Sequence, residues 1–293
     1  MSDVLVRGQS IDGAIRVFVG VTTDLVNKAH EIHNTSPVAT AALGRTLTVA
    51  AIMGQGLKNE TDSVTLQFRG DGPIGNIVAV TDSKSQVRGY VVNPYVDLPL
   101  NENGKLDVGG AVGKGYLHVI RDLSMKEPYS GQVPIITGEI AEDVTYYYAK
   151  SEQIPTAIGL GVLVGTDNRA ICAGGFMIQL MPEATEEVTG KIEDRMKEIK
   201  PITEMLERGM TAEDMLFYLT EGFDMLVQNE TVEPKYQCKC SKKRMHDAVV
   251  SVGKKELRKI IDEDGECEVE CQFCNSKFVF DKEALEEMYK KAR

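Results

Sequence analysis

The chain has 293 residues, of which 42% are hydrophobic, and a formal net charge of −11. This acidic balance speaks against general affinity for nucleic acids or anionic membranes. Charged residues interrupt the apolar stretches at the N-terminus, which argues against a signal peptide, and no other segment approaches the roughly 18 consecutive apolar residues of a membrane span. We therefore expect a cytoplasmic protein without a membrane partner.

The sequence of the first two-thirds of the chain predicts helices mixed with antiparallel strands. Ser36 and Pro37 are typical of a helix start, and the apolar stretch after them predicts a buried helix to about Met53. Strands are predicted for SVTLQF, NIVAV, VRGYVV, GKGYLHVIRDL and GQVPIIT, a helix for EIAEDVTYYYAKSE, and strands again for GLGVLVG and AICAGGFMIQLMP. We predict an α+β fold class, with an antiparallel-sheet domain and packed helices over residues 1–182.

Residues 183–232 change to a helical pattern. Apolar residues recur at helical spacing at Val188, Ile192, Met196 and Ile199. Thr211 and Asp214 predict an N-terminal cap for a further helix. Seven of the twelve methionines lie between residues 177 and 225, and methionine suits surfaces that bind many partners, although ordinary helix packing also explains it. We predict a helical, methionine-rich linker here.

Residues 233–293 form a third region that holds five of the six cysteines. Its pattern predicts a helix after Cys240, a helix in KKELRKIIDED, the strands CEVEC and KFVFD, and a closing helix from Asp281. Large apolar residues are few, and small domains with a thin core usually need a staple. In a cytosolic chain, clustered cysteines indicate a metal-binding or redox-active site more often than a disulfide framework.

Two close pairs of cysteines predict a metal site that would stabilise this small domain. Cys238 and Cys240 form a C-x-C motif, and Cys271 and Cys274 form a C-x-x-C motif thirty residues further on. Side chains two apart on an extended chain point the same way, so both sulfurs of the first pair can face one metal. Four thiolates in two pairs match a tetrahedral structural zinc site, with one Zn²⁺ per chain. We expect these four cysteines to be the ligands.

The same spacing allows redox chemistry. Thiolates flanked by Lys239, Lys242, Lys243 and Arg244 are held deprotonated, which favours oxidation wherever an oxidant reaches them. Each pair can close a short, readily reduced disulfide ring, and such oxidation would remove the zinc ligands. A permanent structural zinc ribbon fits the spacing equally well, so the spacing leaves both interpretations open.

The chain resembles a known family, the redox-regulated 33-kDa heat-shock chaperones of bacteria (heat shock protein 33). The resemblance covers nearly the whole chain. It is strongest in SPVATAALGRTL, FRGDGPIGNIVAV, VRGYVVNP, YSGQVPIITGEIAEDVTYYYAKSEQIPTAIGLGVLV, AGGFMIQLMPEA, CKCSKKR and CQFC. The combination of C-x-C and C-x-x-C followed by an aromatic strand is its most specific element.

The resemblance implies a holdase that works without ATP and is not an enzyme. In that family the reduced form binds one zinc through four cysteines and is inactive. Oxidants with heat form two disulfides within the close pairs, here Cys238 with Cys240 and Cys271 with Cys274. The zinc domain and linker then unfold, and exposed apolar surface holds unfolding client proteins, often as a homodimer, at least when oxidised. The candidate client-binding residues are Met196, Met205, Met210, Met215, Leu216 and Phe217.

Cys267 departs from the family pattern. It precedes Cys271 by four residues. It could be buried, replace a ligand or act as a resolving thiol. Because four better-spaced thiols already complete a tetrahedron, we interpret it as a buried or bystander residue.

Several other motifs carry weaker signals. Gly70 to Gly75 matches G-x-G-x-x-G, but a strand follows it, so we predict a hairpin turn without a phosphate site. His30 and His33 are interpreted as helix-surface residues, His246 as a solvated helix residue, and Cys172 as a buried core thiol.

Two alternative functions remain. The first is a zinc-ribbon interaction module that binds nucleic acid or ribosomes, which is disfavoured by the near balance of 14 basic and 12 acidic residues between Lys235 and Arg293. The second is a thiol–disulfide oxidoreductase, which would need its C-x-x-C at a helix start, whereas CQFC lies between predicted strands.

Overall fold

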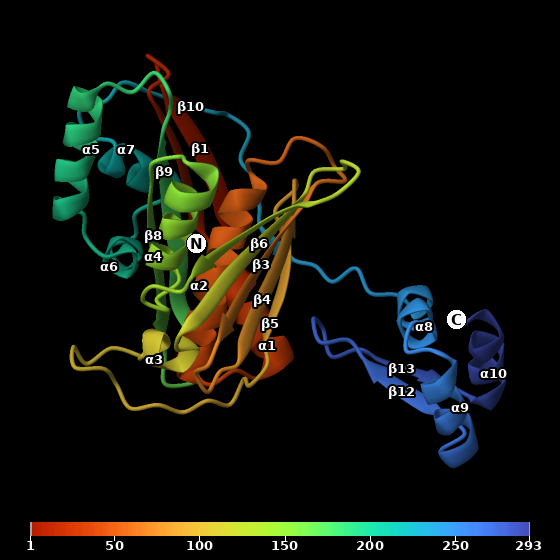
Figure 1. Ribbon diagram of the computed structural model, residues 1–293. Coiled ribbons are helices and arrows are strands. Elements are labelled where there is room, and N and C mark those ends of the chain that lie inside the picture. The colour runs from red at the N-terminus through yellow and green to blue at the C-terminus, as the bar shows by residue number, and fades with distance from the viewer. Residues whose placement is uncertain (1, 293) are drawn as a thin grey trace. The chain divides into compact units, whose positions relative to one another are not determined.

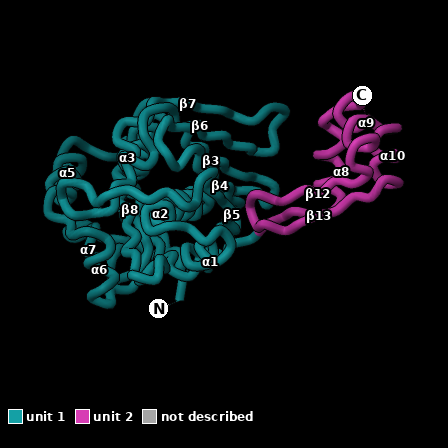
Figure 2. Tube along the Cα trace, turned by 90° about the horizontal axis from the view of Figure 1, so that it is seen from below, with its two compact units in different colours: residues 1–237 teal, residues 238–293 magenta. Residues whose placement is uncertain are grey.

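The computed structural model describes residues 2–292 and divides the chain into two compact units. The first unit spans residues 1–237 and the second spans residues 238–293, shown in teal and magenta in Figure 2. The chain has both sheets and helices, so the predicted α+β class is confirmed. The predicted linker, residues 183–232, lies inside the first unit.

Two sheets form the framework of the first unit. One sheet has the strand order β10-β1-β2-β9-β8, and the other has the order β11-β5-β4-β3-β6-β7. All neighbouring pairs are antiparallel except β11 with β5. The strands are β1 (Val4–Ser10), β2 (Ile15–Val21), β3 (Ser63–Gly70), β4 (Asn76–Asp82), β5 (Gln86–Val91), β6 (Gly115–Asp122), β7 (Tyr129–Pro134), β8 (Thr156–Val164), β9 (Ala170–Leu180), β10 (Met225–Val227) and β11 (Lys235–Tyr236).

Helix α2 (Pro37–Gly54) is the centre of this unit. It contacts strands of both sheets and starts where the Ser36-Pro37 pair predicted it. It is the one described helix long and apolar enough to cross a membrane, but 89% of that stretch is buried, so it is a core helix. The main core cluster contains Leu47 from α2 together with Phe18 and Phe68 from the two sheets.

The other helices of the first unit pack around these sheets. Their bounds are α1 (Thr23–His33), α3 (Val108–Val112), α4 (Ala141–Tyr147), the π-helix η1 (Tyr148–Glu152), α5 (Glu186–Glu198), α6 (Ile202–Glu207) and α7 (Ala212–Leu219). The strands predicted between residues 63 and 181 are all present. The pattern did not predict β1, β2 or α1, nor that the helix in EIAEDVTYYYAKSE ends as a π-helix.

The linker helices α5, α6 and α7 cover one sheet of the first unit. They lie on the side of the β8–β9–β2–β1 sheet opposite to α2 (Figure 1). A second core cluster joins Val17 and Val19 of β2 to Met205, Met215 and Leu216 of the linker. The predicted cap is present, because the Thr211 hydroxyl accepts a hydrogen bond from the Asp214 N–H at 3.1 Å. The linker is therefore folded and packed in this structure.

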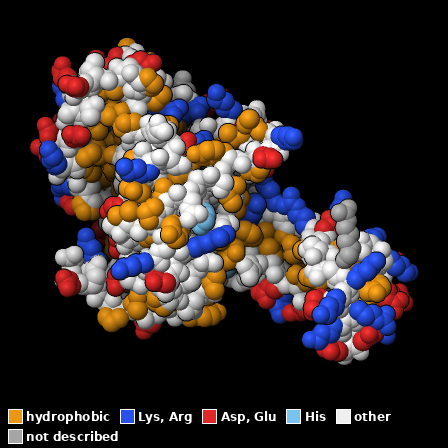
Figure 3. Space-filling model, in the orientation of Figure 1, with side chains coloured by type: hydrophobic (Ala, Val, Ile, Leu, Met, Phe, Trp, Pro, Cys, Tyr) orange, Lys and Arg blue, Asp and Glu red, His pale blue; other side chains and the backbone are white. Residues whose placement is uncertain are grey.

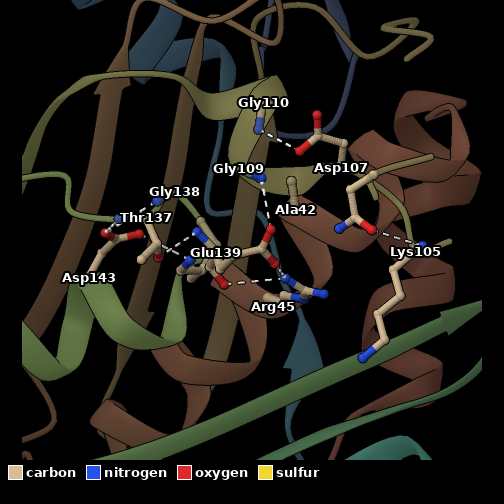
Figure 4. A network of polar contacts seen from close by, with 12 residues as sticks. Ala42, Arg45, Lys105, Asp107, Gly109, Gly110, Thr137, Gly138, Glu139 and Asp143 are labelled. Carbon is tan, nitrogen blue, oxygen red and sulfur yellow. Dashed lines mark hydrogen bonds and ion pairs between the residues drawn. The ribbon is translucent and has the colours of Figure 1, made fainter. Parts of the chain in front are cut away.

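A buried polar network ties α2 to the turns before α4 (Figure 4). Asp143 is fully buried and accepts hydrogen bonds from the backbone N–H groups of residues 136, 137, 138 and 140 at 2.7 to 3.4 Å. The Glu139 carboxylate pairs with Arg45 of α2 and accepts the Gly109 N–H of α3 at 3.1 Å. The Asp143 carboxylate thus accepts hydrogen bonds from four backbone N–H groups that would be costly to bury without partners.

The second unit is small and has its own core. It consists of α8 (Lys242–Val250), α9 (Lys254–Glu263), the hairpin β12 (Cys267–Glu270) and β13 (Lys277–Phe280), and α10 (Lys282–Lys291), as the pattern predicted. The four clustered cysteines belong to the same unit. The buried apolar residues of its core are Val249, Leu257, Ile261, Phe280, Leu285, Met288 and Ala292. Lys, Arg, Asp and Glu side chains intermingle over its visible surface, without a large patch of one sign (Figure 3).

Candidate metal centre

The segment that leads to the cysteines is fixed to both sheets of the first unit. Val232 and Leu5 exchange backbone hydrogen bonds at 2.7 and 3.2 Å, and β11 adds to the edge of β5. The Tyr236 hydroxyl donates to the Gly89 carbonyl at 2.7 Å and lies 3.1 Å from Nε2 of His33. The chain is therefore anchored up to residue 237, directly before Cys238.

The interpretation of His33 as a helix-surface residue was wrong. His33 is only 7% exposed, and its Nε2 also lies 3.0 Å from the Gly89 carbonyl. Burial lowers the pKa of His33. β11 packs against α1 and β5 and brings Tyr236 to His33 from 203 positions away, so the local helical pattern could not reveal this site. His30 is half-buried, with Nδ1 3.1 Å from the Thr35 hydroxyl.

Each cysteine pair is positioned by local backbone structure. Cys238 and Cys240 lie in the irregular segment between β11 and Ser241, whose hydroxyl caps α8 by accepting the Arg244 N–H at 3.3 Å. Cys271 and Cys274 lie in the turn of the β12–β13 hairpin. In that turn the Cys271 carbonyl accepts the N–H groups of Cys274 and Asn275 at 3.1 and 2.7 Å. Asn275 has a φ of 56°, a left-handed conformation that asparagine tolerates better than most residues.

The four sulfurs converge as the sequence predicted. Sγ of Cys238 lies 3.7 Å from Sγ of Cys271, and Sγ of Cys240 lies 3.4 Å from Sγ of Cys274. All four sulfurs lie within 4.8 Å of one another. Tetrahedral zinc with Zn–S bonds of about 2.3 Å would place its sulfurs roughly 3.8 Å apart. The donor type and spacing therefore fit a metal ion, and no other group of this kind occurs among residues 2–292.

The surroundings of the four thiols are not equivalent. Cys271 is buried, whereas the other three are partly exposed. Burial raises the pKa of Cys240 and of Cys271. Burial also opposes ionisation of Cys274, but hydrogen bonds from Ser276 and from the neighbouring thiols Cys240 and Cys238 outweigh it and lower the pKa of Cys274 to about 7. Sγ of Cys274 lies 3.2 Å from the Ser276 hydroxyl. The environment therefore favours ionisation of Cys274 and opposes ionisation of Cys240 and Cys271.

The two remaining cysteines lie outside this group. Cys267 is half-buried on β12 opposite Phe280, and burial raises its pKa. Cys172 is buried on β9, as predicted, and burial raises its pKa to about 11. His246 is half-buried on α8 with Nδ1 3.1 Å from Asp247, and it does not belong to the four-sulfur group. All six cysteines are free thiols in the structure.

The candidate client-binding residues are mostly covered in this structure. Met205, Met215 and Leu216 are at most 1% exposed, Met196 and Met210 are half-buried, and Phe217 is 48% exposed. The buried members pack against the β1–β2–β9 sheet face. Their role in client binding stays a prediction, and in this conformation only Phe217 offers a large exposed apolar surface.

Comparison with known proteins gives one consistent result. Residues 3–281 match the family model described as Hsp33 protein. The 33 kDa chaperonin of Clostridium beijerinckii is 46% identical over 294 residues, and that of Caldanaerobacter subterraneus subsp. tengcongensis is 47% identical over 293 residues, each covering 99% or more of both chains. The crystal structure of the 33 kDa chaperonin from Thermotoga maritima matches with a TM-score of 0.91 and 39% identity over 99% of both chains. The chain belongs to the Hsp33 family.

Proposed function

We propose that this chain is a redox-regulated, ATP-independent holdase of the cytoplasm that prevents aggregation of unfolding client proteins under oxidative and heat stress. The shared name 33 kDa chaperonin supports a chaperone. The observation that carries the regulatory part is the convergence of four thiols within 4.8 Å in a unit with a thin core. The reduced, metal-bound form is the inactive state.

In this proposal Cys238, Cys240, Cys271 and Cys274 hold one Zn²⁺. Four sulfur donors at this spacing suit zinc better than the oxygen-preferring Mg²⁺ or Ca²⁺. When bound, the ion keeps the four thiolates together and joins the segment before α8 to the β12–β13 hairpin. Structural zinc contributes about 10–16 kcal/mol in small zinc-dependent domains at neutral pH, which would stabilise a unit with only seven buried apolar residues in its core.

Oxidation forms two disulfides, Cys238 with Cys240 and Cys271 with Cys274. Formation of each disulfide removes two electrons from a pair of sulfurs. One hydrogen peroxide accepts these two electrons and, with two protons from the thiols or the solvent, becomes two water molecules. In the zinc-bound form all four sulfurs are thiolates, which is the nucleophilic form that peroxide oxidises. The closest sulfur contacts in the structure join Cys238 to Cys271 and Cys240 to Cys274, so disulfide mapping tests the pairing directly.

Loss of the four ligands unfolds the second unit and frees the linker. The linker then exposes Met205, Met215 and Leu216, which are buried against the β1–β2–β9 sheet in the folded state. Both the uncovered sheet face and the released helices offer apolar surface to clients, together with Met196, Met210 and Phe217. The oxidised form is a homodimer in this proposal, which light scattering of the reduced and oxidised protein tests.

The test measures chemistry and activity on the same samples. Bound zinc and free thiols are counted before and after peroxide treatment at raised temperature, and aggregation of a heat-unfolded client is followed by light scattering. We expect the loss of one zinc and four thiols per chain together with a gain in aggregation suppression. Retained zinc, or equal suppression by both forms, would contradict the switch.

The chain offers a matched control for the ligand assignment. Cys238→Ser removes one of the four converging sulfurs, whereas Cys267→Ser removes a half-buried cysteine of the same unit outside that group. We expect Cys238→Ser to lose stoichiometric zinc and Cys267→Ser to retain it and to keep its response to peroxide. Equal zinc content in the two variants would remove Cys238 from the ligand set.

A further inference from the structure

Strand β8 is an unprotected edge of the five-stranded sheet. Its one neighbouring strand among residues 2–292 is β9. Its nine residues, TAIGLGVLV, include no charged residue and no proline, and its register with β9 is regular from Thr156 to Leu163. The other sheet edges of this unit are short or interrupted, because β10 and β11 have three and two residues and β7 ends in Pro134. Native proteins usually protect a long apolar edge with charges, prolines or bulges, so β8 has the features of an edge that accepts a further strand.

The pairing with β9 determines which main-chain groups of β8 face outward. Directly before β8, the Leu180 N–H donates to the Pro155 carbonyl at 2.9 Å, so these two opposed residues form a hydrogen-bonded pair. Such pairs alternate along antiparallel strands. The odd-numbered residues of β8 therefore bond to β9, whereas Thr156, Ile158 and Leu160 direct their N–H and C=O groups away from it. Beyond the strand pairing, no main-chain group of these three residues has a hydrogen bond among residues 2–292.

These outward groups lie along a groove between α4 and the linker. The groove has a volume of about 670 Å³, within the range of about 300–1,000 Å³ that is usual for binding sites. Residues 156–160 of β8 line it together with Tyr146 of α4 on one side and Met196 and Ile202 of the linker on the other. Hydrophobic side chains gather between α5 and the neighbouring strands (Figure 3). Alternate side chains of an added strand would thus meet apolar walls on both faces of the sheet.

The groove favours a single extended segment over a folded partner. Both α4 and α6 contact β8 and flank its edge (Figure 1). A second copy of this chain would bring its own α4 and α6 beside its β8, and these helices would collide with the same elements here. The two charged residues that line the groove, Glu142 and Lys200, have opposite signs. The occupant that fits is therefore an extended segment with apolar side chains and no required charge.

We propose that the β8 edge binds an extended apolar segment of a non-native polypeptide, which joins the sheet as an added strand. The main chain of the segment pairs with Thr156, Ile158 and Leu160, and its side chains enter the two apolar walls. The identity of the partner rests on the chaperone function proposed above, but the binding itself needs no oxidation. In the reduced form the linker wall limits the groove to a short segment, and release of the linker opens the same edge to longer chains.

A short synthetic peptide tests this site in the reduced, zinc-loaded protein. The probe is a fluorescein-labelled heptapeptide of alternating valine and threonine, which is neutral and favours an extended conformation. Fluorescence anisotropy measures its binding, and amide hydrogen exchange is recorded with and without it. We expect saturable binding and, at a peptide concentration ten times the Kd, about tenfold slower exchange at the N–H groups of Thr156, Ile158 and Leu160.

Three outcomes of this experiment would overturn the proposal. The first is the absence of saturable binding, and the second is binding without protection of the three amides, which would place the peptide elsewhere. The third is protection that rises with protein concentration in the absence of peptide, which would assign the edge to a second copy of the chain. Because no oxidant and no aggregating client is used, failure here is distinct from failure of the redox switch.

Two proline variants separate main-chain pairing from contact with the groove walls. Ile158→Pro removes one outward N–H but no hydrogen bond to β9, and proline is tolerated at such edge positions. Gln132→Pro is the matched control at the β7 edge, where the Ile135 N–H donates to the Gly115 carbonyl at 2.9 Å and the same alternation turns the Gln132 N–H outward. Both variants are first checked for zinc content and for amide protection in α2.

We expect Ile158→Pro to bind the heptapeptide about tenfold more weakly than the wild-type protein, and Gln132→Pro to bind it with unchanged affinity. Equal affinities of the two variants would overturn the pairing with β8. If Ile158→Pro does not fold, the exchange pattern of the wild-type protein decides the question without it.

Discussion

The two units of this chain reach stability by different means. The first unit buries two apolar clusters on the two faces of one sheet, with α2 and the linker helices as covers. The second unit has a core of seven buried apolar residues but brings four sulfurs within 4.8 Å of one another. Domains with so little core usually depend on a metal or disulfides. In the function proposed above these four sulfurs both hold the stabilising zinc and are oxidisable, so the fold of the second unit is the one that an oxidant would switch off.

Metal removal is the strongest test of this difference between the two units. A strong zinc chelator under reducing conditions should unfold the second unit and leave the core of the first unit folded, because the loss of about 10–16 kcal/mol exceeds the stability of a small domain. Amide hydrogen exchange measures both units in one sample. We expect full exchange in α9 and α10 and continued protection in α2. Protection of α9 and α10 without metal would show that seven apolar residues are enough.

A matched pair of core substitutions sharpens the comparison. Phe68 on β3 and Phe280 on β13 are both at most 2% exposed, one in each unit. Replacing a buried phenylalanine by alanine costs about 3–5 kcal/mol in either place. If folding and metal binding are coupled in the second unit, as proposed, Phe280→Ala should weaken zinc affinity by about 150-fold to 4,000-fold. Phe68→Ala should destabilise the first unit and leave zinc affinity unchanged, as measured by competition with a chromogenic chelator.

Local sequence patterns predicted the elements of the second unit better than the packing of His33 and Tyr236 at the end of the first unit. Short-range signals define the close cysteine pairs and the closing helix from Asp281, and both are present in the structure. The buried position of His33 depends on Tyr236, which lies 203 residues away. The π-helix that begins at Tyr148 packs against strand β7, and the sequence pattern did not predict it either. No periodicity in the sequence encodes such contacts between distant segments.

Titration of Asp3 tests whether the first unit has a pH dependence of its own. Burial raises the pKa of Asp3 to about 6, against the backbone N–H groups of Asp24 and Leu25, which donate to it at 2.9 and 2.7 Å. Between pH 4 and 6 the folded state therefore binds more protons than the unfolded state, so this group's contribution to the free energy of unfolding decreases as pH rises.

Asp3→Asn isolates this effect. Across pH 4 to 6 the unfolding free energy of the variant should gain at most about 3 kcal/mol relative to the wild-type protein, whatever constant cost the substitution adds. The measurement compares hydrogen exchange of α2 amides in the two proteins at equal pH. A constant difference across this range would contradict the raised pKa.

The smallest predicted effect concerns the linker, whose release connects cysteine oxidation to client binding in the proposed function. The Thr211 hydroxyl caps α7 by accepting the Asp214 N–H at 3.1 Å, and Thr211→Ala should cost the linker about 1 kcal/mol. If linker release limits activation, the variant should gain aggregation suppression on oxidation at a temperature a few degrees lower than the wild-type protein, with unchanged zinc content. Thr189→Ala is the matched control, because Thr189 lies within α5 and its hydroxyl donates to the Thr185 carbonyl at 3.1 Å without capping a helix. Equal activation temperatures for both variants would place the barrier to activation in the second unit alone.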